Sequence, residues 1–141
     1  MRPGIIYFVL AIFVMNSCNL DQVESKYDDY ESASNAGLFN KMWIPKEFIS
    51  ESMENIYLRT NLDMNTCIFS YSVSQQEMDK LYASFQTSSI EYMPPKGIKI
   101  PQWWSDIVAN QDSIINFSSD LSDTFQIVID RNTNTIFGWL N

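Results

Sequence analysis

The residues of this 141-residue chain that could do acid–base chemistry are few and scattered. The chain has no histidine, so it lacks the commonest general base and the commonest metal ligand. Nothing in the spacing of its acids holds two carboxylates about 5 to 9 Å apart, as glycoside hydrolysis requires. The segment from Asp120 to Asp123 lacks the alternating oxygen ligands and the glycine of a calcium loop. We therefore expect no enzyme, no bound metal and no cofactor. The acids considered for these two kinds of site are Asp106, Asp112, Asp120 and Asp123.

Cys18 has the clearest chemistry, because it ends a short apolar stretch that follows one basic residue, Arg2. The stretch from Ile5 to Met15 would rise only ~16 Å as a helix, well short of the ~30 Å hydrocarbon core of a bilayer. This pattern predicts an export signal at residues 1–17. An uncleaved anchor, or an ordinary signal peptide with an incidental cysteine, is the alternative.

The residues before Cys18 resemble the lipobox of bacterial lipoproteins, in which the cysteine is lipidated and becomes the first residue of the mature chain. The usual lipobox has Leu, a small residue and Gly or Ala, whereas this chain has Met15, Asn16 and Ser17. The looser form is similar to that of Bacteroidetes-type lipoproteins. The resemblance implies a protein of the cell envelope, held on the membrane by a lipid on Cys18, at the outer membrane in preference to the inner, facing the periplasm or the cell surface.

The mature chain would be acidic, with eight basic and 17 acidic residues and a net charge of −9. Such a surface makes nucleic acid an unsuitable partner. Residues 18–36 carry five acids and few aliphatic side chains, which predicts a flexible acidic tether. Acids after the lipidated cysteine also resemble the export signal of surface lipoproteins; a solvated spacer is the plainer interpretation. Cys67 is then the one remaining thiol, and we expect it in the core, with a reactive thiol as the alternative.

Residues 37–141 have the patterns of one folded domain, supplied with core material by many of the 20 aromatic residues of the chain. Alternating apolar residues predict one hairpin over residues 55–73 and another over 125–140. Between them, Ser74 to Glu77 fits a capping box. The expected fold is α+β, an antiparallel sheet of about four strands with one amphipathic helix packed on one face. The helix would bury one face, formed by Met78, Leu81, Tyr82 and Phe85.

The segment after this helix contains Pro94, Pro95, Gly97 and Pro101, which a helix or a central strand does not tolerate. It ends in Trp103 and Trp104. The tryptophan pair could form an exposed platform for an envelope protein or a glycan, because indoles give a large contact area at little entropic cost. Alternatively, the pair caps the core beneath a loop. The loop residues that would share the platform are Tyr92, Met93, Lys96 and Lys99.

A tripeptide in the same part of the chain, Asp112-Ser113-Ile114, resembles the short O-glycosylation acceptor of Bacteroidetes envelope proteins. The resemblance implies that Ser113 would carry the glycan. A chance match of three residues is the plainer interpretation.

The order of elements from Ile44 to Trp139 resembles a family of small, uncharacterised bacterial envelope domains, often lipoproteins or singly anchored. Three short motifs carry the resemblance: Ile44-Pro45 before the first hairpin, Pro101-Gln102-Trp103-Trp104, and the closing hairpin from Ile129 to Thr135. The family brings no activity, cofactor or catalytic residue. We therefore expect a non-catalytic binding or accessory protein of the envelope. An immunity-type inhibitor, whose acidic body covers a basic toxin, is one alternative, and a histidine-independent glycan or peptidoglycan enzyme is another.

Overall fold

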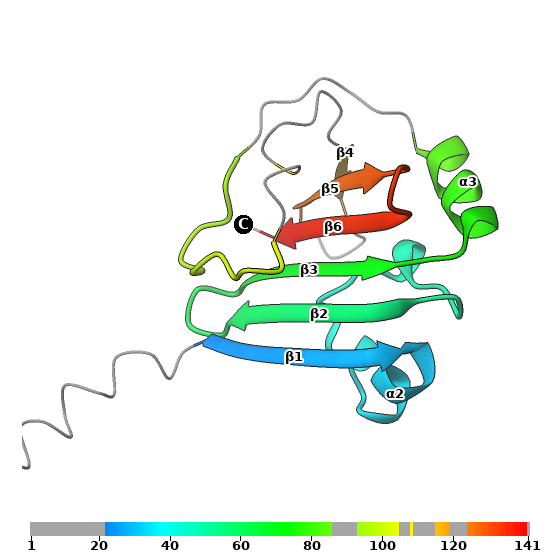
Figure 1. Ribbon diagram of the computed structural model, residues 1–141. Helices are drawn as coiled ribbons and strands as arrows, with labels where there is room; N and C mark the ends of the chain where they lie inside the picture. Colours follow the sequence, from blue (N-terminus) through cyan, green and yellow to red (C-terminus); the bar gives the residue numbers. More distant parts are fainter. Residues whose placement is uncertain (1–21, 86–92, 105–107, 109–114, 119–123, 141) are drawn as a thin grey trace, which may run out of the picture.

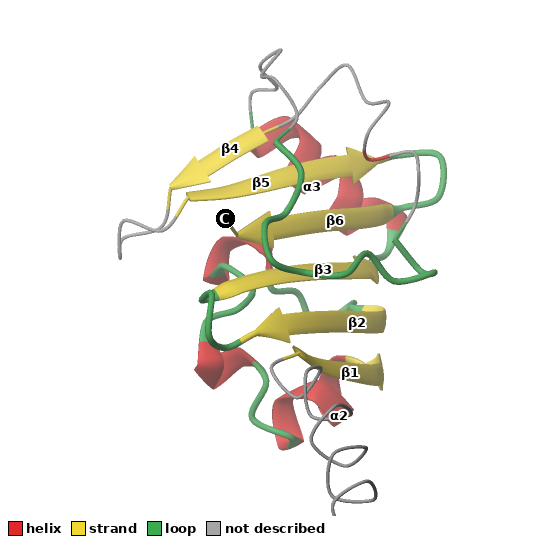
Figure 2. Cartoon of the chain, turned by 90° about the vertical axis from the view of Figure 1, so that its left-hand side faces the viewer, coloured by secondary structure: helices red, strands yellow, loops and turns green. Residues whose placement is uncertain are grey.

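A computed structural model describes residues 22–85, 93–104, 108, 115–118 and 124–140 (Figures 1 and 2). Within these ranges the chain forms one six-stranded antiparallel sheet with the strand order β1-β2-β3-β6-β5-β4. The strands are β1 (Gln22–Asp29), β2 (Glu54–Asn61), β3 (Thr66–Ser72), β4 (Ile115–Ser118), β5 (Thr124–Asp130) and β6 (Thr135–Leu140). The helices are α2 (Tyr30–Asn35) and α3 (Gln75–Ser84), and two short 3-10 turns are η1 (Phe39–Lys41) and η2 (Lys46–Phe48).

The α+β class and the two predicted hairpins are confirmed, but the sheet is larger than the expected four strands. The hairpins β2–β3 and β5–β6 join through β3 and β6 at the centre of the sheet. Asn65 and Asn134 close their turns with φ of 49° and 52°, a left-handed conformation that asparagine tolerates better than most residues. β1 and β4 extend the sheet at its two edges.

The predicted flexible tether is wrong for residues 22–35, because this segment belongs to the folded body. β1 pairs with β2 from Gln22 to Asp29, and its Tyr27 packs against the main core. Asp29 then caps α2: its carboxylate accepts a hydrogen bond from the amide of Ser32 at 2.8 Å, which lowers the pKa of the carboxyl. Ala33 of α2 is completely buried. Four of the acids that suggested disorder, Glu24, Asp28, Asp29 and Glu31, lie in these elements with exposed side chains.

One face of the sheet carries the larger core, covered by α2, the two 3-10 turns and α3. An aromatic cluster at its centre joins three separate segments, with the Phe48 ring centroid 4.6 Å from that of Phe85 and 5.3 Å from that of Phe117. Cys67 is fully buried here, as expected, and its thiol donates to the carbonyl of Trp43 at 3.4 Å. The buried members of this core are Ala33, Leu38, Ile44, Phe48, Met53, Ile56, Leu58, Cys67, Phe69, Tyr71, Val73, Met78, Leu81, Phe125, Ile127, Ile136 and Leu140.

Helix α3 begins at the predicted cap, with the hydroxyl of Ser74 accepting a hydrogen bond from the amide of Glu77 at 3.3 Å. The other half of the expected capping box is replaced, because the amide of Ser74 donates to the hydroxyl of Ser52 at 3.3 Å. Met78 and Leu81 are buried, and Phe85 is half-buried against the same core. Tyr82, expected on the buried face, is instead 42% exposed, and the guanidinium of Arg131 lies over its ring at 4.6 Å. None of the helices in the described ranges is both long and apolar enough to cross a bilayer.

The opposite face of the sheet carries a second, smaller core. Ile68, Val128, Phe137 and Trp139 point to this side, which explains why successive residues of β5 and β6 are buried on both faces. Ile98, Trp104 and Val108 cover them from outside the sheet. Figure 2 shows α3 and this covering loop on opposite sides of the sheet. The strands are therefore held by cores on both faces.

The absence of a side chain at Gly138 leaves space on the face of the sheet for the side chains of the two neighbouring strands. It pairs with Phe69 on β3 and with Ile127 on β5. A Cβ at Gly138 would lie 2.1 Å from Cζ of Phe69 and 2.7 Å from Cδ1 of Ile127, closer than non-bonded carbons approach. The Phe69 ring thus occupies the space above this glycine.

Gly138→Ala is expected to lower the free energy of unfolding by about 1 to 3 kcal/mol or more, because the buried Phe69 ring must leave its position. Chemical denaturation measures this cost. The same substitution in a Phe69→Leu background should cost less, since the terminal ring atoms are gone. An alanine that costs the same in both backgrounds would contradict the packing described for Gly138.

Candidate functional site

Residues 93–104 cross the face of the sheet opposite the helices, and we call this segment the strap. It contains Pro94, Pro95 and Pro101 and forms no regular helix or strand, as the sequence predicts. Figure 2 shows it running in front of β5 and β6 towards β3. Because the strap is not paired as a strand, its backbone N–H and C=O groups need other hydrogen-bond partners. Side chains of the sheet supply them.

The middle of the strap is bound at the ends of β1 and β2. Gln22 and Asn61, which are directly paired in the sheet, both donate to the carbonyl of Gly97, at 3.2 Å and 2.7 Å. The amide oxygen of Gln22 accepts from the backbone N–H of Lys99 at 3.1 Å. Gly97 has φ of +68°, so the tight bend that presents its carbonyl favours glycine. One glutamine side chain therefore binds the strap through both its donor and its acceptor.

The start of the strap is bound over β5 and β6. The backbone N–H of Met93 donates to the side-chain oxygen of Gln126 at 3.1 Å, and the indole N–H of Trp139 donates to the carbonyl of Met93 at 2.7 Å. Gln126 and Trp139 are paired in the sheet. Thr66 donates from its hydroxyl to the carbonyl of Lys96 at 3.1 Å. Side chains on five strands, β1, β2, β3, β5 and β6, thus bind the strap's backbone.

Glu24 on β1 is the charged centre of this network. Its carboxylate accepts hydrogen bonds from the guanidinium of Arg59, which is its direct partner on β2, and from the indole N–H of Trp103 at 3.0 Å. Arg59 in turn donates to the carbonyl of Lys99 at 2.6 Å. The hydrogen bond from Arg59 lowers the pKa of Glu24 below its ordinary value of 4.5, more than partial burial raises it, and the bond from Trp103 lowers it further.

Acid is expected to destabilise the fold through Glu24. Because the pKa of Glu24 is lower in the folded than in the unfolded chain, its contribution is fully present above the unfolded value and is lost as the pH falls through the folded value. Asp29 acts with the same sign. The free energy of unfolding should therefore fall as the pH decreases below about 5, and Glu24→Gln should flatten part of that fall. Denaturant titrations at successive pH values measure it; identical profiles would contradict this role.

The adjacent tryptophans of the strap have different surroundings. Trp104 is buried in the second core, with its ring centroid 5.8 Å from that of Phe137 and 5.7 Å from that of Trp139, both edge to face. Trp103 is half-buried, and its ring stacks on Tyr57 with centroids 5.5 Å apart. The pair therefore does not form a single exposed platform. Trp104 caps the core, as the alternative interpretation of the sequence held.

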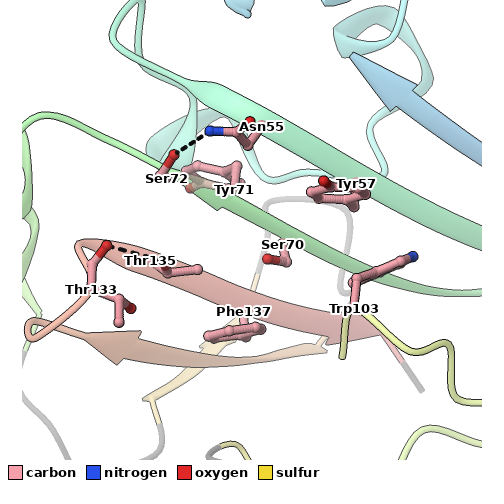
Figure 3. Close-up of a pocket in the computed structure, with 9 residues that line it drawn as sticks. All are labelled: Asn55, Tyr57, Ser70, Tyr71, Ser72, Trp103, Thr133, Thr135 and Phe137. Atoms are coloured by element: carbon pink, nitrogen blue, oxygen red, sulfur yellow. Dashed lines mark hydrogen bonds between the residues drawn. The ribbon is translucent and has the colours of Figure 1, made fainter. Parts of the chain in front are cut away.

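Beside Trp103, the strap leaves part of the sheet face uncovered as an open groove of about 380 Å³ (Figure 3). Ser70 of β3 lies between Tyr57 of β2 and Phe137 of β6, its two neighbours in the sheet, and Trp103 stands at one end. Asn55 and Ser72 are joined by a hydrogen bond of 3.4 Å on one side. The lining residues are Asn55, Tyr57, Ser70, Tyr71, Ser72, Trp103, Thr133, Thr135 and Phe137.

The groove combines aromatic rings with neutral hydrogen-bonding groups. Hydroxyl and amide side chains both donate and accept, so they suit a polar, uncharged ligand surface. The phenol of Tyr71 is directed away from such a ligand, because it donates to the carbonyl of Phe48 at 2.5 Å, and burial raises its pKa. The lining residues include no carboxylate, thiol or lysine. This composition suits the binding of such a ligand.

The remaining residues predicted from the sequence are divided between the strap and the undescribed parts of the chain. Met93, Lys96 and Lys99 lie in the strap with exposed side chains, but they do not line the groove. Cys18, Tyr92 and Ser113 lie outside the described residues, as do the acids Asp106, Asp112, Asp120 and Asp123. Within the described ranges, no three acidic or cysteine side chains gather as a metal site.

The sequence analysis missed the groove residues on β2, β3 and β6. Their signal was the alternation along each strand, which puts Ser70 and Ser72 on one face of β3 and Thr135 and Phe137 on one face of β6. Alternation alone shows that these residues share a face with one another. It does not show that the strap covers one part of that face and leaves this part open.

Residues 21–72 match the family model of the YbbD head domain. The match spans 52 of the 141 residues, from the start of β1 to the end of β3, and it supports the expected resemblance to an envelope-type domain. The strap and β4 to β6 lie outside it. The search of curated proteins and the search of solved structures found no match. The lipid on Cys18 and a Bacteroidetes origin stay predictions from the sequence.

Proposed function

We propose that this chain is a lipid-anchored protein of the cell envelope, of non-catalytic binding or accessory type, which holds an envelope protein or a glycan in the groove beside Trp103. The observation that carries the proposal is the open groove itself. Other parts of the same sheet face are covered by the strap, whereas Ser70, Ser72 and Thr135 are left beside aromatic rings in the groove.

The lining of the groove supports binding in two ways. Tyr57 and Trp103 form a stacked pair whose geometry is fixed by the hydrogen bond from the indole to Glu24, so a ligand would not have to order these rings. The hydroxyls of Ser72 and Thr135 donate to the carbonyls of Glu54 and Thr133, so they would offer a ligand their acceptor oxygens. Rigid aromatic side chains next to adaptable hydroxyls are a combination that recurs in protein binding surfaces.

The position of Cys18 supports the anchor. The apolar stretch from Ile5 to Met15 and the lipobox-like residues before Cys18 predict export and lipidation. The family match and the folded body both begin within four residues of this cysteine. A body attached so closely to a lipid would remain at the membrane, where the groove would meet other envelope components.

A photo-crosslinking amino acid tests the groove in the full-length protein in cells. Placed at Thr133 on the rim, the probe is expected to give a specific adduct, and Thr135→Trp, which fills the groove with an indole, should abolish it. A probe at Gln76, exposed at the start of α3, should not give this adduct, and Glu31→Trp on α2 should leave the Thr133 adduct unchanged.

The identity of the adduct distinguishes a protein partner from a glycan, and recovery of a basic toxin would indicate an inhibitor. The same adduct from Thr133 and Gln76, or an adduct that survives Thr135→Trp, would contradict binding in the groove.

A further inference from the structure

One end of the sheet combines exposed apolar side chains, lysines and the start of the described chain. β1 begins here, β2 ends and β3 begins, at the left of Figure 1. Leu62 and Met64, in the turn between β2 and β3, are 62% and 54% exposed, and Ile100 of the strap is 46% exposed. Lys96 and Lys99 are exposed beside them. We call these five residues the strap-end patch.

The members of the patch are held together by contacts already described. A Cβ on Gly97 would lie 2.9 Å from Cγ of Met64, so the strap rests on this turn. The backbone N–H of Lys99, next to Ile100, donates to Gln22 at 3.1 Å. Gln22 is paired with Asn61, the residue before Leu62. The first residue of β1 therefore lies beside the patch.

We infer that the strap-end patch lies against the lipid surface to which Cys18 is anchored. This inference rests on the proposed lipid anchor. Gln22 is four residues after Cys18 in the sequence. The Cα atoms of these two residues can therefore lie at most about 14 Å apart, the span of a fully extended chain. A lipidated Cys18 therefore keeps Gln22, and the patch around it, at the depth of the headgroups or just above them.

The chemistry of the patch fits a membrane interface. The transfer of side chains such as Leu62 and Met64 into the boundary between headgroups and acyl chains lowers the free energy. Nearby lysines are attracted to anionic lipid. Asp63 is the acid of this turn and Asp21 precedes Gln22 in the sequence, whereas Glu24, the nearest acid on β1, is paired with Arg59. The mature chain has a net charge of −9, so an anionic membrane would repel most of its surface. The patch would turn the lysine-bearing end towards the lipid.

A fluorophore placed on the patch tests the inference in the full-length, lipidated protein. The protein is reconstituted in vesicles of phosphatidylethanolamine and phosphatidylglycerol that contain a doxyl-labelled lipid as quencher. Met64→Cys carries the fluorophore, and Asn132→Cys, in the β5–β6 turn at the opposite end of the strands, is the matched control. Cys67 is buried, so the dye attaches to the introduced cysteine.

The expected result is that the quencher removes most of the emission at Met64→Cys and little at Asn132→Cys. Leu62→Gln together with Ile100→Gln should reduce the quenching at Met64→Cys without releasing the protein from the vesicles. Equal quenching at both positions would overturn the inference. Protection of Met64→Cys from a water-soluble quencher without quenching by the lipid would indicate a second copy or another protein on the patch, and would overturn it as well.

Flotation separates this inference from the anchor on which it rests. The wild type should incorporate radiolabelled palmitate and float with the vesicles, and Cys18→Ser should do neither. If the wild type fails to float, the anchor proposal fails and takes the inference with it. If the wild type floats while the two fluorophores are quenched equally, the anchor stands and only the orientation is refuted.

Discussion

The hydrogen bonds that Glu24 accepts from Arg59 and Trp103 are the interaction on which the strapped face depends. Arg59 is held by this carboxylate and donates to the strap at Lys99, while Trp103 is fixed at the far end of the same segment. A strap of twelve residues without a ladder would otherwise lose its backbone hydrogen bonds to water. Glu24 also lies on β1, so the same carboxylate links the edge strand, its neighbour and the strap.

The position of the strap decides both surfaces to which we assign a function. Where its backbone binds Gln22 and Asn61, it places Lys99 and Ile100 beside the β2–β3 turn. Where it ends, Trp104 enters the second core and Trp103 forms the end of the groove. The covered and the open parts of one sheet face thus follow from one set of side-chain contacts. In the proposed account, the covered end faces lipid and the open groove faces a ligand.

The sequence predicted the helix and the hairpins that are determined by residues close to one another in the chain. The helix at Gln75–Ser84 follows from the cap at Ser74 and the spacing of Met78 and Leu81, and the two hairpins follow from period-two alternation. The sequence analysis missed β1, because its acids indicate disorder until Glu24 is paired with Arg59, 35 residues away. Tyr82 was misplaced for a similar reason, since the residue that contacts its ring, Arg131, is distant in sequence.

The candidate site was predicted in part for the same reason. The sequence indicated that Trp103 and Trp104 would form either a binding platform or a cap on the core. Adjacent residues of an irregular segment can point in different directions, and here Trp103 stacks on Tyr57 while Trp104 packs in the second core. Gln22 was assigned to the tether, and Asn61 and Gln126 alternate with apolar residues along their strands. Only the tertiary structure shows that they satisfy the backbone of a segment 33 to 77 residues away in sequence.

Hydrogen exchange of the strap amides tests the central claim most directly. The backbone N–H groups of Met93 and Lys99, which donate to Gln126 and Gln22, should exchange with deuterium far more slowly than in an unfolded chain, and Glu24→Gln should speed the exchange of Lys99 more than that of Met93. Exchange of both amides at unfolded-chain rates in the wild type would mean that the strap is not bound to the sheet, and would contradict the account.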